Sequence, residues 1–397
     1  MLALARWDGP YSSTAFSLAK ELAKSNRLFF IDNPITFRYF FLNFWRPQIR
    51  RRIKALLFGM NPYFIPDDHN GNFITVTPRL TLPINFLSGG NFYNTLSLIN
   101  DGVLNKVLKR TVKDYAIKNF IFINCFNPFY VRRFPKGFTP KLFVYMTVDD
   151  IRHSTHIKKH GPQLEMEMMA RADVVFATSR ELTLLAGKYS KHAYHLPNAA
   201  DISLFKTSHE QSLSVPPELS EVNQPMVIYT GNIDHRLDFD LLNELVKGNP
   251  EINFILVGPV SIDEIELKTL RAFPNVLFTG KKDLTELPSF LKHSQCAIIP
   301  FKCNTLTKSI YPLKINEYLA TGTPVVATPF SDDIQTFSDI IAIAENPESF
   351  SKSIHEAIRN NSSEQESARL RFVENNTWKA RVEYFWDIVN QYQHKKS

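Results

Sequence analysis

Cysteine is scarce in this sequence, and its few occurrences follow no metal or redox pattern. The 397-residue chain has three cysteines, Cys125, Cys296 and Cys303, and no Cys-x-x-Cys pair. Each follows or interrupts an apolar run, so we expect all three to be reduced, buried thiols. A disulfide scaffold is therefore excluded. The hydrophobic content of 44% is instead enough to give two or three domains a core each.

Long hydrophobic runs are also absent. No stretch of about 18 consecutive apolar residues occurs. Residues 1–10 lead directly into strand-like sequence, without the apolar centre of a signal peptide. We therefore expect neither a membrane span nor secretion, and we expect a cytoplasmic protein.

Acidic residues are under-represented in one half of the chain. Residues 1–200 carry more than twice as many Lys and Arg as Asp and Glu, whereas residues 201–397 carry more acids than bases. Such an imbalance suggests that one domain meets an anionic surface or ligand. The alternative is ordinary variation between solvated surfaces.

Apolar runs alternate with amphipathic stretches along the whole chain. Continuous apolar strands separated by helices are typical of parallel sheets covered on both faces. We therefore predict an α/β protein with two doubly wound, Rossmann-like parallel-sheet domains that face a cleft. The predicted strands lie within residues 2–7, 27–32, 73–76, 119–124, 141–148, 173–179 and 193–198 of the first half, and 226–230, 253–257, 276–279, 296–301, 324–328 and 340–344 of the second.

The domain boundaries follow from a polar, proline-containing segment without apolar periodicity. This segment, residues 206–225, is predicted to be a linker. The N-terminal domain then comprises residues 1–205 and the C-terminal domain residues 226–375. Residues 376–397 are expected to form a helix that packs back on the N-terminal domain.

Glycine is also rare, so the 14 glycines present are expected at positions that need them. Gly231, Gly258 and Gly280 each come directly after a predicted strand, and Gly322 stands where a helix C′ glycine belongs. Ligands of open parallel sheets bind beyond the carboxyl ends of the strands. The three strand-end glycines therefore outline a ligand pocket, with ordinary tight turns as the alternative.

Residues 311–328, YPLKINEYLATGTPVVAT, combine a helix start with a buried strand. Ser309 is expected to cap the helix, and Pro312 to stand early in its first turn. The helix dipole and Lys314 would then form an anion site, while Glu317, on the same face, could accept two hydrogen bonds from a cis-diol. The alternative is a solvated i,i+3 pair.

These residues resemble the family 4 (group 1) glycosyltransferases, which have the two-domain GT-B fold. The resemblance rests on residues 312–328 together with 196–205, 228–234, 254–259 and 276–301, and it covers roughly residues 140–345. It implies transfer of a sugar from a nucleotide donor held by the C-terminal domain to an acceptor held by the N-terminal domain. No cofactor is expected, and a UDP-sugar is the expected donor.

The resemblance also assigns roles to single residues. Glu317 matches the second glutamate of the family's E-x₇-E motif, which contacts the ribose, whereas Ser309 stands where the first would be. This departure resembles a subgroup of bacterial polysaccharide-assembly transferases. Arg236 lies near the family's basic residue for the diphosphate. With Lys314 it would stabilise charge on the leaving nucleotide without a metal.

The N-terminal half offers two further candidates. The loop after the first strand contains Gly9, Ser12 and Ser13, which suit contacts to phosphate or to a sugar acceptor. Asp149 and Asp150 follow the strand predicted within 141–148. We interpret them either as a general base for the acceptor hydroxyl or as a helix N-cap.

Two further patterns could indicate binding sites, namely three histidines at helical spacing and a segment rich in aromatic and basic residues. His153, His156 and His160 have helical spacing, but no acids or cysteines accompany them, so a metal site is not expected. Residues 36–58 mix many aromatic side chains with basic ones, which include Arg50, Arg51 and Arg52. This segment suits an anionic membrane surface on the inner face of the membrane, or else packs within the domain. No nucleic-acid-binding signature is present.

The combined prediction is a cytoplasmic glycosyltransferase, peripherally bound to the membrane, that acts on a lipid-linked or oligosaccharide acceptor in assembly of a cell-surface polysaccharide or glycolipid. One alternative is a nucleotide-sugar epimerase, although the acids and histidine that it needs are not found. The other is a catalytically silent sugar- or lipid-binding subunit of the same fold, which the absent first glutamate favours.

Overall fold

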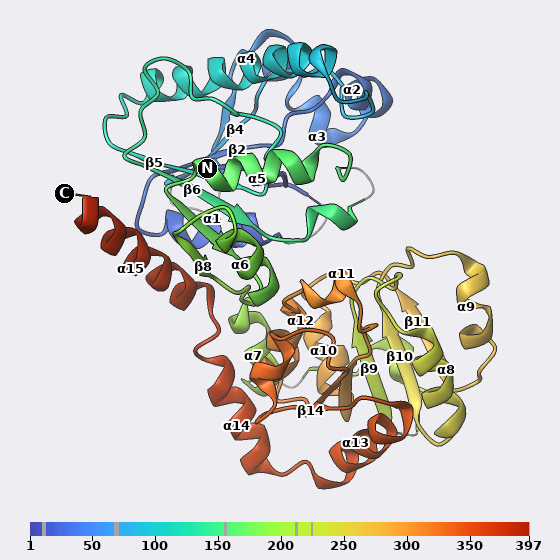
Figure 1. The fold of residues 1–397 in the computed structure, drawn as a ribbon. Helices are drawn as coiled ribbons and strands as arrows, with labels where there is room; N and C mark the ends of the chain where they lie inside the picture. The colour runs from blue at the N-terminus through green and yellow to red at the C-terminus, as the bar shows by residue number, and fades with distance from the viewer. Residues whose placement is uncertain (10–12, 67–70, 155–156, 211–212, 224, 397) are drawn as a thin grey trace. The chain divides into compact units, whose positions relative to one another are not determined.

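The computed structural model describes residues 1–9, 13–66, 71–154, 157–210, 213–223 and 225–396. The chain divides into two units, one made of Met1–Pro197 with the residues from Val382 onward, the other of Asn198–Arg381. Each unit contains its own parallel sheet (Figure 1). The predicted pair of doubly wound α/β domains is therefore confirmed.

The sheet of the first unit has eight strands in the order β3-β4-β2-β1-β5-β6-β7-β8. All neighbouring strands are parallel except β3 and β4. The strands are β1 Leu2–Ala3, β2 Leu28–Ile31, β3 Tyr63–Phe64, β4 Phe73–Val76, β5 Ile121–Cys125, β6 Leu142–Thr147, β7 Val174–Ala177 and β8 Ala193–His195. Strand β3 was not predicted, because two residues are too short to show a period.

The helices of the first unit lie between these strands. They are α1 Thr14–Ala23, α2 Phe37–Asn43, α3 Pro47–Arg50, α4 Asn91–Asp114, α5 Gly161–Arg171 and α6 Arg180–Gly187, with a π-helical turn at Lys54–Phe58 and a 3₁₀ turn at Ile151–His153. The segment predicted for a membrane surface, residues 36–58, thus consists of α2, α3 and the π-helical turn. Phe40, Ile49 and Leu56 from its inner side form a small core.

The second unit holds a six-stranded, fully parallel sheet in the order β11-β10-β9-β12-β13-β14. Its strands, β9 Met226–Thr230, β10 Asn253–Val257, β11 Val276–Gly280, β12 Cys296–Ile299, β13 Val325–Ala327 and β14 Ala342–Ile343, coincide with the six predicted ones. Strand β9 is buried along its whole length. A strand covered on both faces must be apolar throughout, which is why the pattern was readable from sequence.

Helices cover this second sheet. They are α7 Ile202–Glu210, α8 Phe239–Gly248, α9 Glu264–Arg271, α10 Leu287–Lys292, α11 Thr305–Lys308, α12 Leu313–Ala320, α13 Pro347–Asn360 and α14 Ser363–Val373, with 3₁₀ turns at Pro217–Leu219 and Ile334–Phe337. Helix α8 contacts α9 and α13, whereas α12 contacts α7 and α14. The unit boundary at residues 197 and 198 lies earlier than predicted, because α7 occupies the start of the supposed linker.

The C-terminal helix α15, Trp378–Lys396, joins the first unit from Val382 onward. Phe385 packs its ring 5.0 Å from that of Phe176 on β7. The hydroxyl of Tyr392 donates to a carboxylate oxygen of Asp173, at 3.2 Å. The last residues of the chain therefore complete the first unit.

Two expectations about exposure are resolved by the structure. Cys125 and Cys296 are buried, and burial raises the pKa of each thiol to about 12. The prediction was wrong for Cys303, which is exposed in the loop after β12. No helix in the described ranges is both long and apolar enough to cross a bilayer.

Candidate functional site

The sheet of the second unit reverses its winding direction between β9 and β12. Strands β10 and β11 extend from one side of β9, and β13 and β14 extend from the far side of β12. In open α/β sheets, the loops at the carboxyl ends of two such strands separate and leave a crevice for a ligand. Gly231 follows β9, and Phe301 follows β12, so the predicted residues flank this crevice.

Gly231 and Gly258 let two neighbouring loops approach closely. Both have positive φ, 134° at Gly231 and 152° at Gly258. A Cβ atom at Gly258 would lie 1.9 Å from the carbonyl oxygen of Gly231, so no side chain fits there. Gly280 has a φ of 73°, but a Cβ atom on it would meet nothing within 4 Å. The close approach of the two loops therefore requires a glycine at Gly258. At Gly280 a glycine is favoured only because the backbone has a positive φ.

Lys314 lies over the aromatic floor of the crevice. Its Nζ atom is 5.0 Å from the ring centre of Tyr229 and 4.9 Å from that of Phe301. A Cβ atom at Gly231 would lie 3.2 Å from the same nitrogen. No described residue forms a hydrogen bond or ion pair with this ammonium group. The glycine therefore provides the space in which Lys314 faces the crevice.

Arg236 is brought to the same place by Asp234. The Nε atom of Arg236 donates to one oxygen of Asp234 at 2.8 Å, and Nη2 donates to the other at 2.6 Å. Burial opposes ionisation of Asp234, but hydrogen bonds and charge from Arg236 prevail and lower its pKa. The guanidinium carbon lies 5.8 Å from the ring centre of Phe301. Asp234 was not predicted, because its only signal in the sequence is its spacing of two residues from Arg236.

Glu317 lies one helical turn after Lys314 on α12, but the two do not form an ion pair within 4 Å in the described structure. Burial raises the pKa of Glu317 to about 7, against the attraction of Lys314. Burial and Arg236 lower the pKa of Lys314 to about 8, against Glu317 and Asp234. Both side chains are only partly buried by surface area. Each therefore retains an unused hydrogen-bonding group that a ligand could reach.

The start of α12 differs from the prediction. Ser309 does not cap α12, because it ends the preceding helix α11 and donates its hydroxyl to the carbonyl of Leu306 at 2.7 Å. Pro312 is itself the N-cap of α12 and makes no side-chain hydrogen bond. Tyr318, which was not predicted, fixes the helix against β9, since its hydroxyl accepts from the amide of Thr230 at 2.8 Å. The predicted anion site would therefore depend on Lys314 and not on a capping serine.

In the first unit, Asp150 occupies an N-cap position. It caps the 3₁₀ turn Ile151–His153, accepting from the amide of Arg152 at 3.0 Å. The Arg152 side chain also donates to both carboxylate oxygens, at 2.8 and 2.6 Å. The neighbouring Asp149 is exposed. Asp150 was predicted to be either a general base or a helix N-cap, and these contacts are those of an N-cap.

The loop after β1 is held by charge pairs. The Gly9 amide donates to the Arg6 carbonyl at 3.1 Å, and Ser13 caps α1, whereas Ser12 lies outside the described residues. Arg52 is buried and donates to Asp8 at 2.7 and 2.9 Å and to Asp32 at 3.2 Å. Sequence patterns gave no sign of this cluster, because its members are far apart along the chain.

Two of the three histidines with helical spacing, His153 and His160, lie among the described residues. Among the described residues, no three His, Cys, Asp or Glu side chains gather as a metal-binding group. His160 stacks on Tyr93, with ring centres 3.8 Å apart. His153 lies 3.6 Å from Asp150, and His156 falls outside the described part. The histidines that are described thus have structural neighbours in the first unit.

Comparison with known proteins agrees with this geometry. Residues 224–360 match the family model described as glycosyl transferases group 1. A putative teichuronic acid biosynthesis glycosyltransferase from Bacillus subtilis is 28% identical over 172 residues, which cover 41% of this chain and 42% of that protein. The matched region thus spans less than half of the relative's length.

Solved structures match over almost the whole chain. One from E. coli, trehalose-6-phosphate bound with UDP-2-fluoro glucose, has a TM-score of 0.69 and 11% identity, covering 99% of this chain and 98% of that one. Sucrose-phosphate synthase from Thermosynechococcus elongatus has a TM-score of 0.66 and 13% identity, with 98% of both chains covered. The chain therefore has the GT-B fold, and residues 224–360 of its second unit match the family model of the glycosyl transferases group 1.

Proposed function

We propose that the protein is a glycosyltransferase whose second unit binds a nucleotide-sugar, with a UDP-sugar as the expected donor. The observation that carries this proposal is the placement of Lys314 and Glu317, one helical turn apart on α12, beside the reversal of the sheet. Lys314 and Arg236 would meet the diphosphate, and Glu317 would accept hydrogen bonds from the ribose diol. Gly231 and Gly258 would allow the phosphates to approach the backbone. Gly280 and Pro312 would shape the rest of the donor site.

The chemistry follows from the charge that develops in the reaction. As the bond between the sugar anomeric carbon and the phosphate oxygen breaks, negative charge collects on the leaving diphosphate. Fixed cations stabilise it most when they are already in position and poorly hydrated. Lys314 over its two aromatic rings and Arg236 held by Asp234 meet both conditions. No metal ion is needed in this scheme.

Donor binding is tested by thermal unfolding with UDP, GDP and ADP, because a ligand of the folded state raises Tm by mass action. We expect one nucleotide to stabilise the wild type, and Glu317→Ala to lose most of that stabilisation. When the corresponding nucleotide-sugar is supplied without an acceptor, the enzyme should hydrolyse it slowly and release the nucleotide. Binding without any release or transfer would instead favour the silent subunit, which the buried non-acidic Ser309 at the first motif position supports.

We further propose that transfer retains the anomeric configuration. The acceptor hydroxyl would form its bond to the anomeric carbon on the face from which the phosphate leaves, and its proton would pass to the departing phosphate oxygen. Asp150 supports this scheme, because the contacts to Arg152 leave its carboxylate poorly placed as a base. Product NMR should show retention, with Asp149→Asn and Asp150→Asn still active. Inversion together with one inactive mutant would identify a base instead.

The acceptor is proposed to be lipid-linked, in assembly of a cell-surface polysaccharide. The teichuronic acid relative supports the polysaccharide, and the aromatic-basic surface of α2 and α3 supports the lipid. We define this surface by its exposed side chains: Phe37, Phe41, Leu42, Phe44, Trp45, Phe58, Arg38, Arg46, Arg50 and Lys54. Rings and cations of this kind suit an anionic bilayer interface.

Arg51 and Arg52 do not belong to this surface. Arg52 is buried on Asp8 and Asp32, and Arg51 pairs with Asp8. Membrane binding is therefore tested with Arg38, Arg46 and Arg50, each changed to Glu, and sedimentation with anionic vesicles. The triple variant should be released, whereas Lys113→Glu, on the exposed end of α4, should not. Equal sedimentation of all proteins would exclude the surface.

A further inference from the structure

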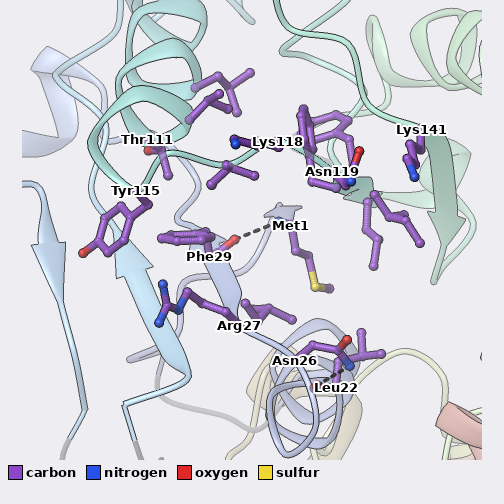
Figure 2. Close-up of a pocket in the computed structure, with 18 of the residues that line it drawn as sticks. Met1, Leu22, Asn26, Arg27, Phe29, Thr111, Tyr115, Lys118, Asn119 and Lys141 are labelled. Carbon is purple, nitrogen blue, oxygen red and sulfur yellow. Dashed lines mark hydrogen bonds between the residues drawn. The ribbon is translucent and has the colours of Figure 1, made fainter.

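A second cavity lies in the first unit, at the edge of the sheet opposite to the carboxyl ends. It has a volume of about 620 Å³ and is bordered by the starts of β2 and β5, the end of α4, and α15 (Figure 2). Pockets that enclose small organic ligands are of this size. Since substrates of such sheets bind at the other edge, this cavity is separate from the proposed donor and acceptor sites.

The interior of the cavity is apolar. Phe29, Leu108, Val112 and Phe122 are among the side chains that form it. The amino group of Met1 also borders it, but this group donates to the carbonyl of Phe29 at 2.7 Å. An apolar chain would therefore be favoured inside.

The rim of the cavity carries charge of one sign. Arg27, Lys118 and Lys141 line it, and its lining contains no Asp or Glu. Figure 2 shows Arg27 across the cavity from Lys118 and Lys141. All three are exposed, and no described residue forms an ion pair or side-chain hydrogen bond with them. Their charges are thus available to an anion.

We propose that this cavity binds a single-chain anionic amphiphile, with the apolar chain inside and a carboxylate or phosphate head at the three cations. Charge complementarity selects the anionic head, and the apolar lining selects the chain. The proposal is independent of the proposed transferase activity, because it uses no residue of the donor or acceptor sites. The helix dipole favours basic residues in the last turn of a helix. Arg27 and Lys118 lie beyond the last turns of α1 and α4, so the dipole alone does not explain why these two positions are basic.

The test is calorimetric titration of the full-length protein with dodecanoate and dodecyl phosphate, below their micelle concentrations. We expect saturable binding of at least one of them, and the two arms distinguish a carboxylate from a phosphate head. The triple variant Arg27→Gln, Lys118→Gln, Lys141→Gln should bind about tenfold more weakly. Lys113→Gln, an exposed change on α4 outside the cavity lining, should bind as the wild type does.

A second measurement locates the chain without relying on those variants. Trp386 lines the cavity, so 12-bromododecanoate should quench its fluorescence, and Trp386→Phe should remove the quenching while binding persists. Val112→Trp should fill the cavity and abolish binding, with an unchanged circular dichroism spectrum and urea unfolding transition as its folding controls. No saturable binding, equal binding of neutral dodecanol, or equal binding by the triple variant would overturn the proposal.

Discussion

Lys314 and Glu317 are charged side chains in poorly solvated positions, and neither is satisfied by a described neighbour. Such groups destabilise the ligand-free protein, because burial disfavours their charged forms. Burial lowers the pKa of Lys314 to about 8 and raises that of Glu317 to about 7, and these shifts reflect the free-energy cost of burying the two charges. A nucleotide that supplies a diphosphate and a diol would remove it. The same residues therefore couple stability to ligand binding.

This coupling predicts a pH-dependent effect of Glu317→Gln. In the folded protein the pKa of Glu317 is raised from 4.5 to about 7. Its contribution to stability is therefore present below pH 4.5 and is lost as the pH rises through about 7. Glu317→Gln should raise the unfolding free energy by on the order of 1 kcal/mol at pH 8, with little effect near pH 4.5. The variant should also bind the nucleotide more weakly. Thermal unfolding at both pH values, with and without nucleotide, checks the prediction, and equal stability at pH 8 would contradict it.

Asp234 predicts a second effect at the level of single residues. Because it orients Arg236 through two hydrogen bonds, Asp234→Asn should reduce transfer by about tenfold, and should weaken binding of the nucleoside diphosphate. Binding of the free nucleoside should not change, since neither residue is assigned to it. Calorimetry with both ligands makes this distinction. Asp240→Asn, the same change at an exposed acid in the first turn of α8, is the matched control.

At the scale of elements, the carboxyl ends of β9 and β10 depend on the contact between two loops. Gly258→Ala would place a methyl group on the Gly231 carbonyl, so the loops must separate. We expect a loss of roughly 3 kcal/mol or more in unfolding free energy, the range of severe core changes. Gly280→Ala should cost only about 1–2 kcal/mol, because its backbone strain is not joined by a clash. Urea unfolding of both variants tests this, and equal losses would contradict the close-approach argument.

The segment from α2 to the π-helical turn illustrates another property of elements. Its outer side carries the aromatic-basic surface, and its inner side carries Arg52, which ties it to Asp8 and Asp32. Burial raises the pKa of Asp32 to about 6, although Arg52 opposes the shift. Arg52→Ala should leave the buried Asp32 without its cation and Asp8 with Arg51 alone, and cost on the order of 3 kcal/mol, as broken buried pairs do. Arg50→Ala, on the exposed side, should change the unfolding free energy little, and urea titration of both variants provides the comparison.

At the scale of the whole molecule, the helix α15 completes a unit whose other residues end at Pro197. Phe385→Ala should remove its contact with Phe176 and cost about 3–5 kcal/mol in the first unit. Hydrogen exchange should then accelerate in β7 and β8 but not in β9. The exposed neighbour Tyr384 provides the control, since Tyr384→Ala removes little buried area. Faster exchange in β9 would show that the two units unfold together.

The sequence predicted the second unit better than the first for a physical reason. A strand buried on both faces is mainly apolar, so β9, β10 and β12 were visible without a structure. Lys314, Glu317 and the strand-end glycines were local in sequence. The cluster of Asp8, Asp32 and Arg52 was not, because tertiary ion pairs leave no periodic pattern. Ser309 was misjudged because α11, a helix of one turn, has no apolar period of its own.

The return of α15 to the first unit has a consequence for synthesis of the chain. Domains generally begin to fold in the order in which the ribosome delivers them, but here the first unit is incomplete until its final segment arrives. Its sheet can form early, while the wall that contains Phe385 and Trp386 is still missing. The second unit, by contrast, has all its strands before that point. Of the two units, the one whose synthesis begins first is therefore the one completed last.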